Sequence, residues 1–249
     1  MQMKFKDIRR RTERFAKQIF GKDVWTYPEV TTELFFAGKE HYVVCSKYLS
    51  PKSIIYSAGI GDDISFDLDI IKTFGASVYG FDPSPVSIAW VEKYNLPVEF
   101  RFFPYGISDH DGTMFLYPPE NPKSTSFSLV DYANTSAKAF EVPVRRVLSV
   151  MKELGHSHID LLKLDIEGGE YMVIDDMIRT DIKPGQIVVE FHHRFSEIGI
   201  SKTKYALRLL KSNGYKIVYV DPRGYVYSFI QQGLVLMQKP DFVVAHSGL

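Results

Sequence analysis

The sequence predicts an α/β fold built around a mostly parallel β-sheet with helices on both faces, and three observations support this. From Ser53 onward, short apolar runs alternate with segments of helical periodicity, which is typical of parallel strands joined by right-handed crossovers. The turn residues Asp221-Pro222-Arg223-Gly224 lie between two apolar runs and predict an antiparallel hairpin at the end of the sheet. Residues 106–147 interrupt the alternation with many Ser, Thr, Pro and aromatic residues, and they predict a β-rich insertion.

Before the insertion, the elements follow from the apolar runs and the residues that stop them. We predict strands at residues 53–57, 77–81 and 98–103, and helices at residues 64–75 and 86–94. The first strand stops at Gly59, and the second stops at Asp82-Pro83. Pro85 suits the first turn of the helix that follows, and Ser84 is placed to cap it.

After the insertion, the alternation resumes. We predict helices at residues 148–154, 168–178 and 203–212, and strands at residues 159–164, 186–191, 215–220 and 225–230. Asn213-Gly214 ends the last of these helices, because glycine suits the position that follows a helix. Within the insertion, residues 113–117 and 125–130 predict two extended segments on either side of a proline-rich loop.

The composition is that of an ordinary globular protein of 249 residues. We predict one domain over residues 1–249, with a helical extension at 1–50, a core at 53–230 and a tail at 231–249. The 30 Lys and Arg residues balance the 30 Asp and Glu residues, which argues against DNA as a partner. No transmembrane segment or signal peptide is expected, and the single cysteine, Cys45, fits an inert buried thiol in a cytoplasmic protein.

The charge is uneven along the chain, because residues 1–22 carry eight Lys and Arg residues against two acids. Phe5, Ile8, Phe15 and Ile19 fall at helical spacing and predict an amphipathic basic helix. This helix is interpreted as lying on the surface of the domain or at an oligomer contact, and a homo-oligomer is possible. The alternative is contact with an anionic substrate, lipid or partner.

A glycine-containing loop and an acid follow the first two strands. Gly59 and Gly61 let the backbone approach a bound group, and Asp82 comes 21 residues after Gly61, at the end of the second strand. A carboxylate at this place accepts hydrogen bonds from ribose hydroxyls, so the pattern predicts nucleoside binding. A tight turn with a helix-capping aspartate is the alternative.

The residues after Gly61 favour one nucleoside cofactor over another. A dinucleotide site requires a third glycine where this chain has Ile64, and the carboxylates of Asp62 and Asp63 would repel a pyrophosphate. The same carboxylates attract the sulfonium and ammonium groups of S-adenosylmethionine. We therefore expect S-adenosylmethionine rather than a nicotinamide cofactor.

Two further clusters lie at the ends of later strands. Asp165 is expected at a strand tip, Glu167 at the start of the next helix, and Glu170 one turn further on, facing the same rim. His192 follows the strand at 186–191, where a histidine can take a proton from a hydroxyl near neutral pH. A histidine that only packs or bonds locally is the alternative reading. Together with His193, these groups could also bind a divalent cation, but no metal is our expectation.

Four motifs in this order resemble the FkbM family of S-adenosylmethionine-dependent methyltransferases. In chain order they are Tyr79-Gly80-Phe81-Asp82-Pro83-Ser84, Gly106-Ile107-Ser108-Asp109, Leu161-Leu162-Lys163-Leu164-Asp165-Ile166-Glu167-Gly168-Gly169-Glu170 and Ile187-Val188-Val189-Glu190. Together with the first strand and its loop, they cover roughly residues 53–193. The first loop departs from the usual family form, because Ser57 replaces an acid. The resemblance implies a Rossmann-like class I methyltransferase fold with a seven-stranded sheet.

The resemblance also implies O-methylation of a hydroxyl on a sugar or natural-product acceptor, which would be a small molecule or glycan. We expect the catalytic residues Asp165, Glu167 and His192. We expect the cofactor-binding residues Ser57, Ala58, Gly59, Gly61, Asp63, Asp82, Pro83, Ser84, Ser108 and Asp165. The insertion and the basic helix are expected to cover the acceptor. The alternatives are a nicotinamide-dependent oxidoreductase and a non-catalytic binding module with the same fold.

Overall fold

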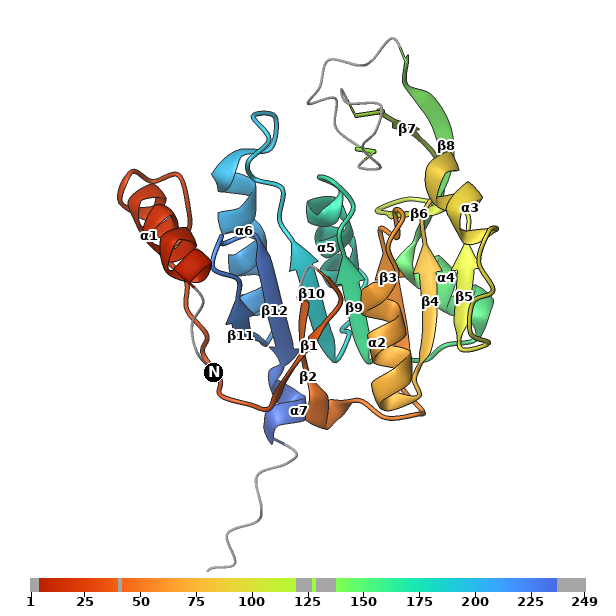
Figure 1. The fold of residues 1–249 in the computed structure, drawn as a ribbon, viewed down its shortest axis with the longest axis horizontal. Coiled ribbons are helices and arrows are strands. Elements are labelled where there is room, and N and C mark those ends of the chain that lie inside the picture. Colours follow the sequence, from red (N-terminus) through yellow and green to blue (C-terminus); the bar gives the residue numbers. More distant parts are fainter. Residues whose placement is uncertain (1–4, 40–41, 120–126, 129–137, 237–249) are drawn as a thin grey trace, which may run out of the picture.

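The computed structural model describes residues 5–39, 42–119, 127–128 and 138–236 (Figure 1). Its central sheet contains β3 (Ile54–Ala58), β4 (Ser77–Phe81), β5 (Phe100–Phe103), β9 (Leu161–Leu164), β10 (Gln186–Glu190), β11 (Tyr215–Val220) and β12 (Val226–Gln231). The strand order is β11-β12-β10-β9-β3-β4-β5, and β12 is antiparallel to both of its neighbours. The predicted sheet and its closing hairpin are therefore confirmed.

Helices cover both faces of this sheet. They are α2 (Ser65–Phe74), α3 (Pro85–Val91), α4 (Val147–Leu154), α5 (Glu170–Arg179), α6 (Gly199–Ser212) and the short α7 (Gln232–Leu236). One hydrophobic core lies between the sheet and the helices α4, α5 and α6, and a second lies on the side of α2 (Figure 1). Ser84 caps α3 as predicted, because its side chain accepts a hydrogen bond from the Ser87 N–H.

The segment before the sheet is only partly the helical extension that we expected. The basic helix α1 (Phe5–Ile19) is present, but β1 (Leu34–Ala37) and β2 (Tyr42–Cys45) form an antiparallel hairpin. This hairpin packs beside α2 and against β10 and β12. Its apolar runs surround Gly38 and Lys39, which is a hairpin pattern that the sequence reading missed. Cys45 is fully buried there, as predicted, and burial raises the pKa of its thiol to about 12.

The insertion forms a separate three-stranded sheet of β6 (Gly106–Ser108), β7 (Gly112–Leu116) and β8 (Phe140–Arg146). The β-rich character is confirmed, although β8 was not predicted. The extended segment expected at residues 125–130 lies largely outside the described residues. Of that segment, Ser128 forms a bridge with Tyr117 at the end of β7. In the described part of the chain, no helix is long and apolar enough to cross a membrane.

Candidate functional site

A cavity of about 440 Å³ opens at the carboxyl ends of β3, β4, β9 and β10. The strand order reverses between β3 and β9, and ligands of such sheets bind in the crevice at this point. The volume lies within the range of roughly 300 to 1,000 Å³ that is typical of small-molecule sites. The cavity lies where the sequence placed the site.

The loop after β3 forms the floor of the cavity. Gly59 and Gly61 both have positive φ angles, of 84° and 56°. A Cβ atom at Gly59 would overlap the carbonyl oxygen of Asp165, so the ends of β3 and β9 can approach each other only at a glycine. The close backbone approach predicted at Gly59 is therefore an approach to the backbone of Asp165.

Asp82 holds this loop in place. One of its carboxylate oxygens accepts hydrogen bonds from the N–H groups of Ile60 and Gly61, both at 2.9 Å, and the other accepts one from Ser84 N–H at 2.8 Å. The oxygen that accepts from Ser84 keeps a second lone pair, so it can still accept a hydrogen bond from a ribose hydroxyl. Asp82 lines the cavity and is 7% exposed.

Acids outnumber cations around the cavity. Its described lining contains six carboxylates and three Lys or Arg side chains. The Lys39 ammonium lies 3.2 Å from a carboxylate oxygen of Asp63. Although burial acts to raise it, the pKa of Asp63 is lowered by hydrogen bonds from Ser65 and by this pair with Lys39. Asp63 therefore stays ionised and also holds the start of α2.

The other predicted cofactor contacts divide into two groups. Pro83 and Ser84 line the cavity next to Asp82. Ser57 and Ala58 are buried inside β3, and Ser108 is buried with its hydroxyl directed to Asp109 and the sulfur of Met114. None of these three lines the cavity, because strand packing covers their side chains.

Asp165 lies at the tip of β9, between a tyrosine and a lysine. Tyr42 in β2 donates a hydrogen bond to the Asp165 carboxylate at 2.6 Å. The ammonium of Lys163 donates to the Gly59 carbonyl at 2.9 Å and lies 3.8 Å from the Asp165 carboxylate. Burial acts to raise the pKa of Asp165, but Lys163, His192 and Tyr42 lower it, so this acid remains ionised.

Glu167 follows in the loop between β9 and α5. Its φ angle is 48°, in the left-handed region that few residues other than glycine adopt. The hydroxyl of Ser128 donates a hydrogen bond to the Glu167 carbonyl at 2.6 Å. The insertion therefore makes a hydrogen bond to the backbone of a predicted catalytic residue.

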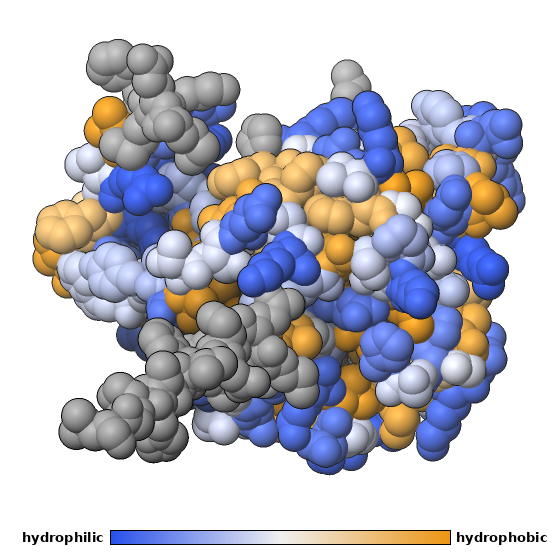
Figure 2. All heavy atoms as spheres, turned by 90° about the horizontal axis from the view of Figure 1, so that it is seen from below, coloured by the Kyte–Doolittle hydropathy of each residue, from blue (hydrophilic) through white to orange (hydrophobic). Residues whose placement is uncertain are grey.

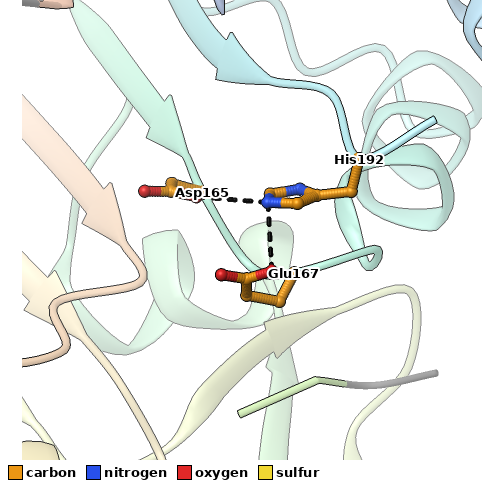
Figure 3. A group of neighbouring side chains, drawn as sticks. All are labelled: Asp165, Glu167 and His192. Atoms are coloured by element: carbon orange, nitrogen blue, oxygen red, sulfur yellow. Dashed lines mark ion pairs between the residues drawn. The ribbon is translucent and has the colours of Figure 1, made fainter. Parts of the chain in front are cut away.

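His192 is held between carboxylates on both sides of its ring. Its Nδ1 lies 2.7 Å from Glu170. Its Nε2 lies 3.1 Å from Glu167 and 3.8 Å from Asp165 (Figure 3). Burial acts to lower the pKa of this imidazole, but Glu170 and Glu167 raise it well above 6.5. The structure thus brings all three predicted catalytic residues together, with a proton held between His192 and Glu167.

The same three side chains could also hold a divalent cation. Asp165, Glu167 and His192 offer ligand atoms that all lie within 4.8 Å of one another. A cation there would take the place of the proton between His192 and Glu167. Our expectation of a site without metal stays a prediction.

A sequence model of the methyltransferase FkbM domain matches residues 47–217, more than half of the chain. The chain belongs to the FkbM methyltransferase family. This FkbM chain is 27% identical over 146 residues to a human protein described as probable methyltransferase-like protein 24. The match covers 55% of this chain and 32% of the human protein, and the rat counterpart gives the same values. The chain thus spans about a third of the length of these curated relatives.

Solved structures show weaker similarity. FkbM methyltransferase from Methylobacillus flagellatus KT is 14% identical with a TM-score of 0.47, over 73% of this chain and 44% of that one. The fibrillarin pre-rRNA processing protein of Methanococcus jannaschii is 13% identical with a TM-score of 0.44, over 74% and 68%. The strand order of this FkbM chain, with antiparallel β12 inserted between β10 and β11, confirms the class I methyltransferase fold.

Two sequence-based expectations about this FkbM chain were wrong. Glu170 does not face the rim of the cavity but is fully buried, because its carboxylate folds back to accept hydrogen bonds from the N–H groups of Ile166 and Gly168. The basic helix α1 does not cover the cavity, since no described residue of α1 lines it. The insertion does line it, through Gly106, Ile107, Leu116 and Phe127.

For several residues of the FkbM site, the sequence did not predict the role that the structure shows. Lys163 was part of the quoted motif, but no role was predicted for it. No sequence feature indicated that Tyr42 belongs to the site, because it precedes Asp165 by more than 120 residues. His193 points away from the cavity and packs edge-on against Tyr225, where burial lowers the pKa of its ring to about 4.

Proposed function

We propose that this chain transfers the methyl group of S-adenosylmethionine to a hydroxyl oxygen of a sugar or natural-product acceptor. The observation that carries the proposal is the placement of His192, at the cavity wall with Glu170 on one ring nitrogen and Glu167 on the other. An imidazole oriented by a buried carboxylate suits removal of a proton from a hydroxyl.

The charge of the cavity supports S-adenosylmethionine as the cofactor. Six carboxylates face three Lys or Arg side chains and the protonated His192, and this excess of acids favours a ligand with sulfonium and ammonium groups over a pyrophosphate. Ile64, which stands where a dinucleotide site has its third glycine, is buried in the core beside α2. Both observations argue against a nicotinamide cofactor.

The residues of the loop and the adjoining strand tip would hold this cofactor. Gly59 and Gly61 let its methionine part lie against the backbone, and Asp82 accepts hydrogen bonds from its ribose hydroxyls. When bound, S-adenosylmethionine supplies a methyl group that is already activated by the positive sulfur. The protein then has to position the acceptor oxygen and remove its proton.

Three side chains on the other side of the cavity would perform that task. Asp165 and Glu167 orient the acceptor hydroxyl through hydrogen bonds, and His192 Nε2 takes its proton. Glu170 keeps a proton on Nδ1, which leaves Nε2 to face the cavity. Because His192 and Glu167 share a proton at rest, that proton has to leave before the base can work.

The walls formed by the insertion support an acceptor with both polar and apolar faces. Leu116 and Phe127 place apolar surface across from the carboxylates of the strand tips. A sugar ring has apolar C–H faces and polar hydroxyls, and many hydroxylated natural products share this character. The acceptor class is therefore consistent with the lining.

The proposal is tested first by calorimetric titration with S-adenosylmethionine, S-adenosylhomocysteine and NAD. We expect binding of the first two and none of NAD. Transfer of a radiolabelled methyl group to a panel of hydroxylated sugars and natural products then identifies the acceptor, and alkali-stable label indicates an ether. Binding of NAD alone would support an oxidoreductase, and no binding of any of the three would support a non-catalytic module.

A further inference from the structure

The helix α1 is turned with its polar side toward the protein. Arg14, whose side chain is 12% exposed, donates hydrogen bonds to the Val24 carbonyl, the Thr26 hydroxyl and the Tyr227 hydroxyl. Gln18 is 7% exposed and donates to the same Val24 carbonyl at 2.9 Å. Surface helices ordinarily bury their apolar side, so the orientation of α1 is the reverse of the usual one.

The apolar side of α1 faces outward. Ile8, Phe15 and Ile19 recur at helical spacing on one stripe and are 44%, 53% and 59% exposed. Trp25, which is 50% exposed, packs edge-on against Phe15 with ring centroids 5.7 Å apart. We call Ile8, Phe15, Ile19 and Trp25 the α1 surface. Seen from below, the molecule has apolar atoms beside hydrophilic ones on the side where Figure 1 draws α1 (Figure 2).

Positive charge surrounds this stripe. The helix carries six Lys and Arg residues against Asp7 and Glu13. Arg9 and Arg11 are exposed and lie on either side of the stripe. The combination of exposed aromatic side chains and flanking cations is typical of helices that lie in the headgroup region of a membrane.

We propose that the α1 surface binds the headgroup region of a membrane containing anionic lipids. A second copy of the chain would cover the stripe only by bringing two strongly basic helices together, whereas an anionic bilayer attracts the same charges. A tryptophan at the edge of the stripe suits the interface between headgroups and acyl chains. This binding is independent of the methyltransferase proposal.

The inner side of α1, opposite the α1 surface, is linked to the candidate site through side-chain contacts. Lys17 donates a hydrogen bond to the Tyr225 hydroxyl at 3.1 Å, and the guanidinium of Arg194 lies over the ring of Tyr225. Arg194 in turn lines the cavity.

The test uses the full chain and vesicles of two compositions, phosphatidylcholine alone and phosphatidylcholine with 30 mol % phosphatidylserine. The chain has two tryptophans, so Trp90→Phe leaves Trp25 as the sole reporter. With anionic vesicles we expect a blue shift of Trp25 emission, and with neutral vesicles a much smaller one. Cosedimentation of the unaltered chain with the same vesicles gives a second measurement that does not depend on Trp90→Phe.

Two variants separate the apolar and charged contributions. Phe15→Gln with Ile19→Gln should lower vesicle affinity by at least tenfold, and Arg9→Gln with Arg11→Gln by about thirtyfold at low salt. Lys72→Gln with Lys93→Gln removes two exposed cations elsewhere, and Val98→Gln removes an apolar side chain that is 86% exposed. Both control variants should bind vesicles as the unaltered chain does.

Three results would overturn the proposal. The first is no binding to anionic vesicles in either measurement. The second is a blue-shifted Trp25 without lipid in a chain that sediments as a dimer, which would assign the α1 surface to a second copy. The third is equal binding by the Phe15→Gln, Ile19→Gln variant and the unaltered chain, which would place the contact elsewhere. Methyl transfer to soluble acceptors can be measured in the same samples, so failure of one proposal is distinguishable from failure of the other.

Discussion

The two sides of the cavity are built in different ways. On the cofactor side, Gly59 to Asp63 and Asp82 to Ser84 are held by hydrogen bonds from backbone N–H groups to one carboxylate. On the acceptor side, Tyr42, Ser128 and His192 come from segments far apart in the chain and meet Asp165, Glu167 and Glu170. The first side is held mainly by contacts between the loops that follow two consecutive strands, and the second is held by segments far apart in the chain.

This difference leads to different expectations for substitutions. Changes on the cofactor side should alter the loop itself, so cofactor affinity and stability should fall together. Changes on the acceptor side should lower the rate and leave cofactor affinity near its original value. A substitution that affected both sides equally would show that the comparison is wrong.

His192→Ala should have the largest effect on the rate. Loss of a general base lowers kcat by about 10² to 10⁴, and we expect a decrease in this range with unchanged S-adenosylmethionine affinity. Turnover is measured with labelled methyl transfer, and affinity by calorimetry. His193→Gln is the matched control, because His193 lies next in the chain but outside the cavity lining. Unaltered turnover in His192→Ala would remove this residue from the mechanism.

Gly59→Ala should be the most disruptive change on the cofactor side. The added Cβ overlaps the Asp165 carbonyl at a φ of 84°, so we expect the free energy of unfolding to fall by about 3 kcal/mol. Cofactor affinity should fall by about a hundredfold, since the same overlap displaces the loop. Gly155→Ala is the control, because Gly155 has a φ of 70° and no atom within 4 Å of the added Cβ. Equal losses in both variants would show that strain, and not the overlap, is responsible.

Asp82→Ala should weaken S-adenosylmethionine binding by about tenfold and also destabilise the chain, because three buried N–H groups lose their acceptor. Asp221→Ala is a close control. Asp221 likewise accepts three backbone hydrogen bonds, from Arg223, Tyr225 and Val226, but lies outside the cavity lining. Urea unfolding and calorimetry should show destabilisation in both variants and weaker cofactor binding only in Asp82→Ala. Unchanged cofactor affinity in Asp82→Ala would contradict the ribose assignment.

The same division explains how much the sequence could predict. The seven strands, the glycine loop and Asp82 follow from apolar periodicity and from the spacing of 21 residues between Gly61 and Asp82. The contact of Tyr42 with Asp165 could not be predicted, because it depends on where the β1–β2 hairpin packs. The orientation of α1 was equally inaccessible, since periodicity identifies the two sides of a helix but not which one faces the protein.

Glu170→Gln tests how the acceptor side sets the charge of His192. In the unaltered chain the raised pKa keeps His192 protonated above pH 6.5, so kcat/KM should rise with pH through that higher value. Replacing Glu170 removes a negative charge that stabilises the imidazolium, so the rise should move to lower pH. The maximal rate should fall about tenfold, because Nδ1 loses its charged partner. A pH profile measured from about pH 5 to 9 checks both effects, and a lower rate with an unshifted profile would mean a purely structural role.

Ser128→Ala should have the smallest effect on activity. It tests directly whether the insertion supports the loop that carries Glu167. It removes the hydrogen bond to the Glu167 carbonyl, and the loss of such a bond costs about 1 kcal/mol. Because Glu167 keeps its left-handed backbone with less support, we expect the KM for the acceptor to rise about threefold and cofactor affinity to stay unchanged. Ser149→Ala, which removes a hydroxyl bonded to Asp111, should change neither quantity. A loss of cofactor affinity in Ser128→Ala would mean that the insertion supports both sides of the cavity, and the division between them would have to be given up.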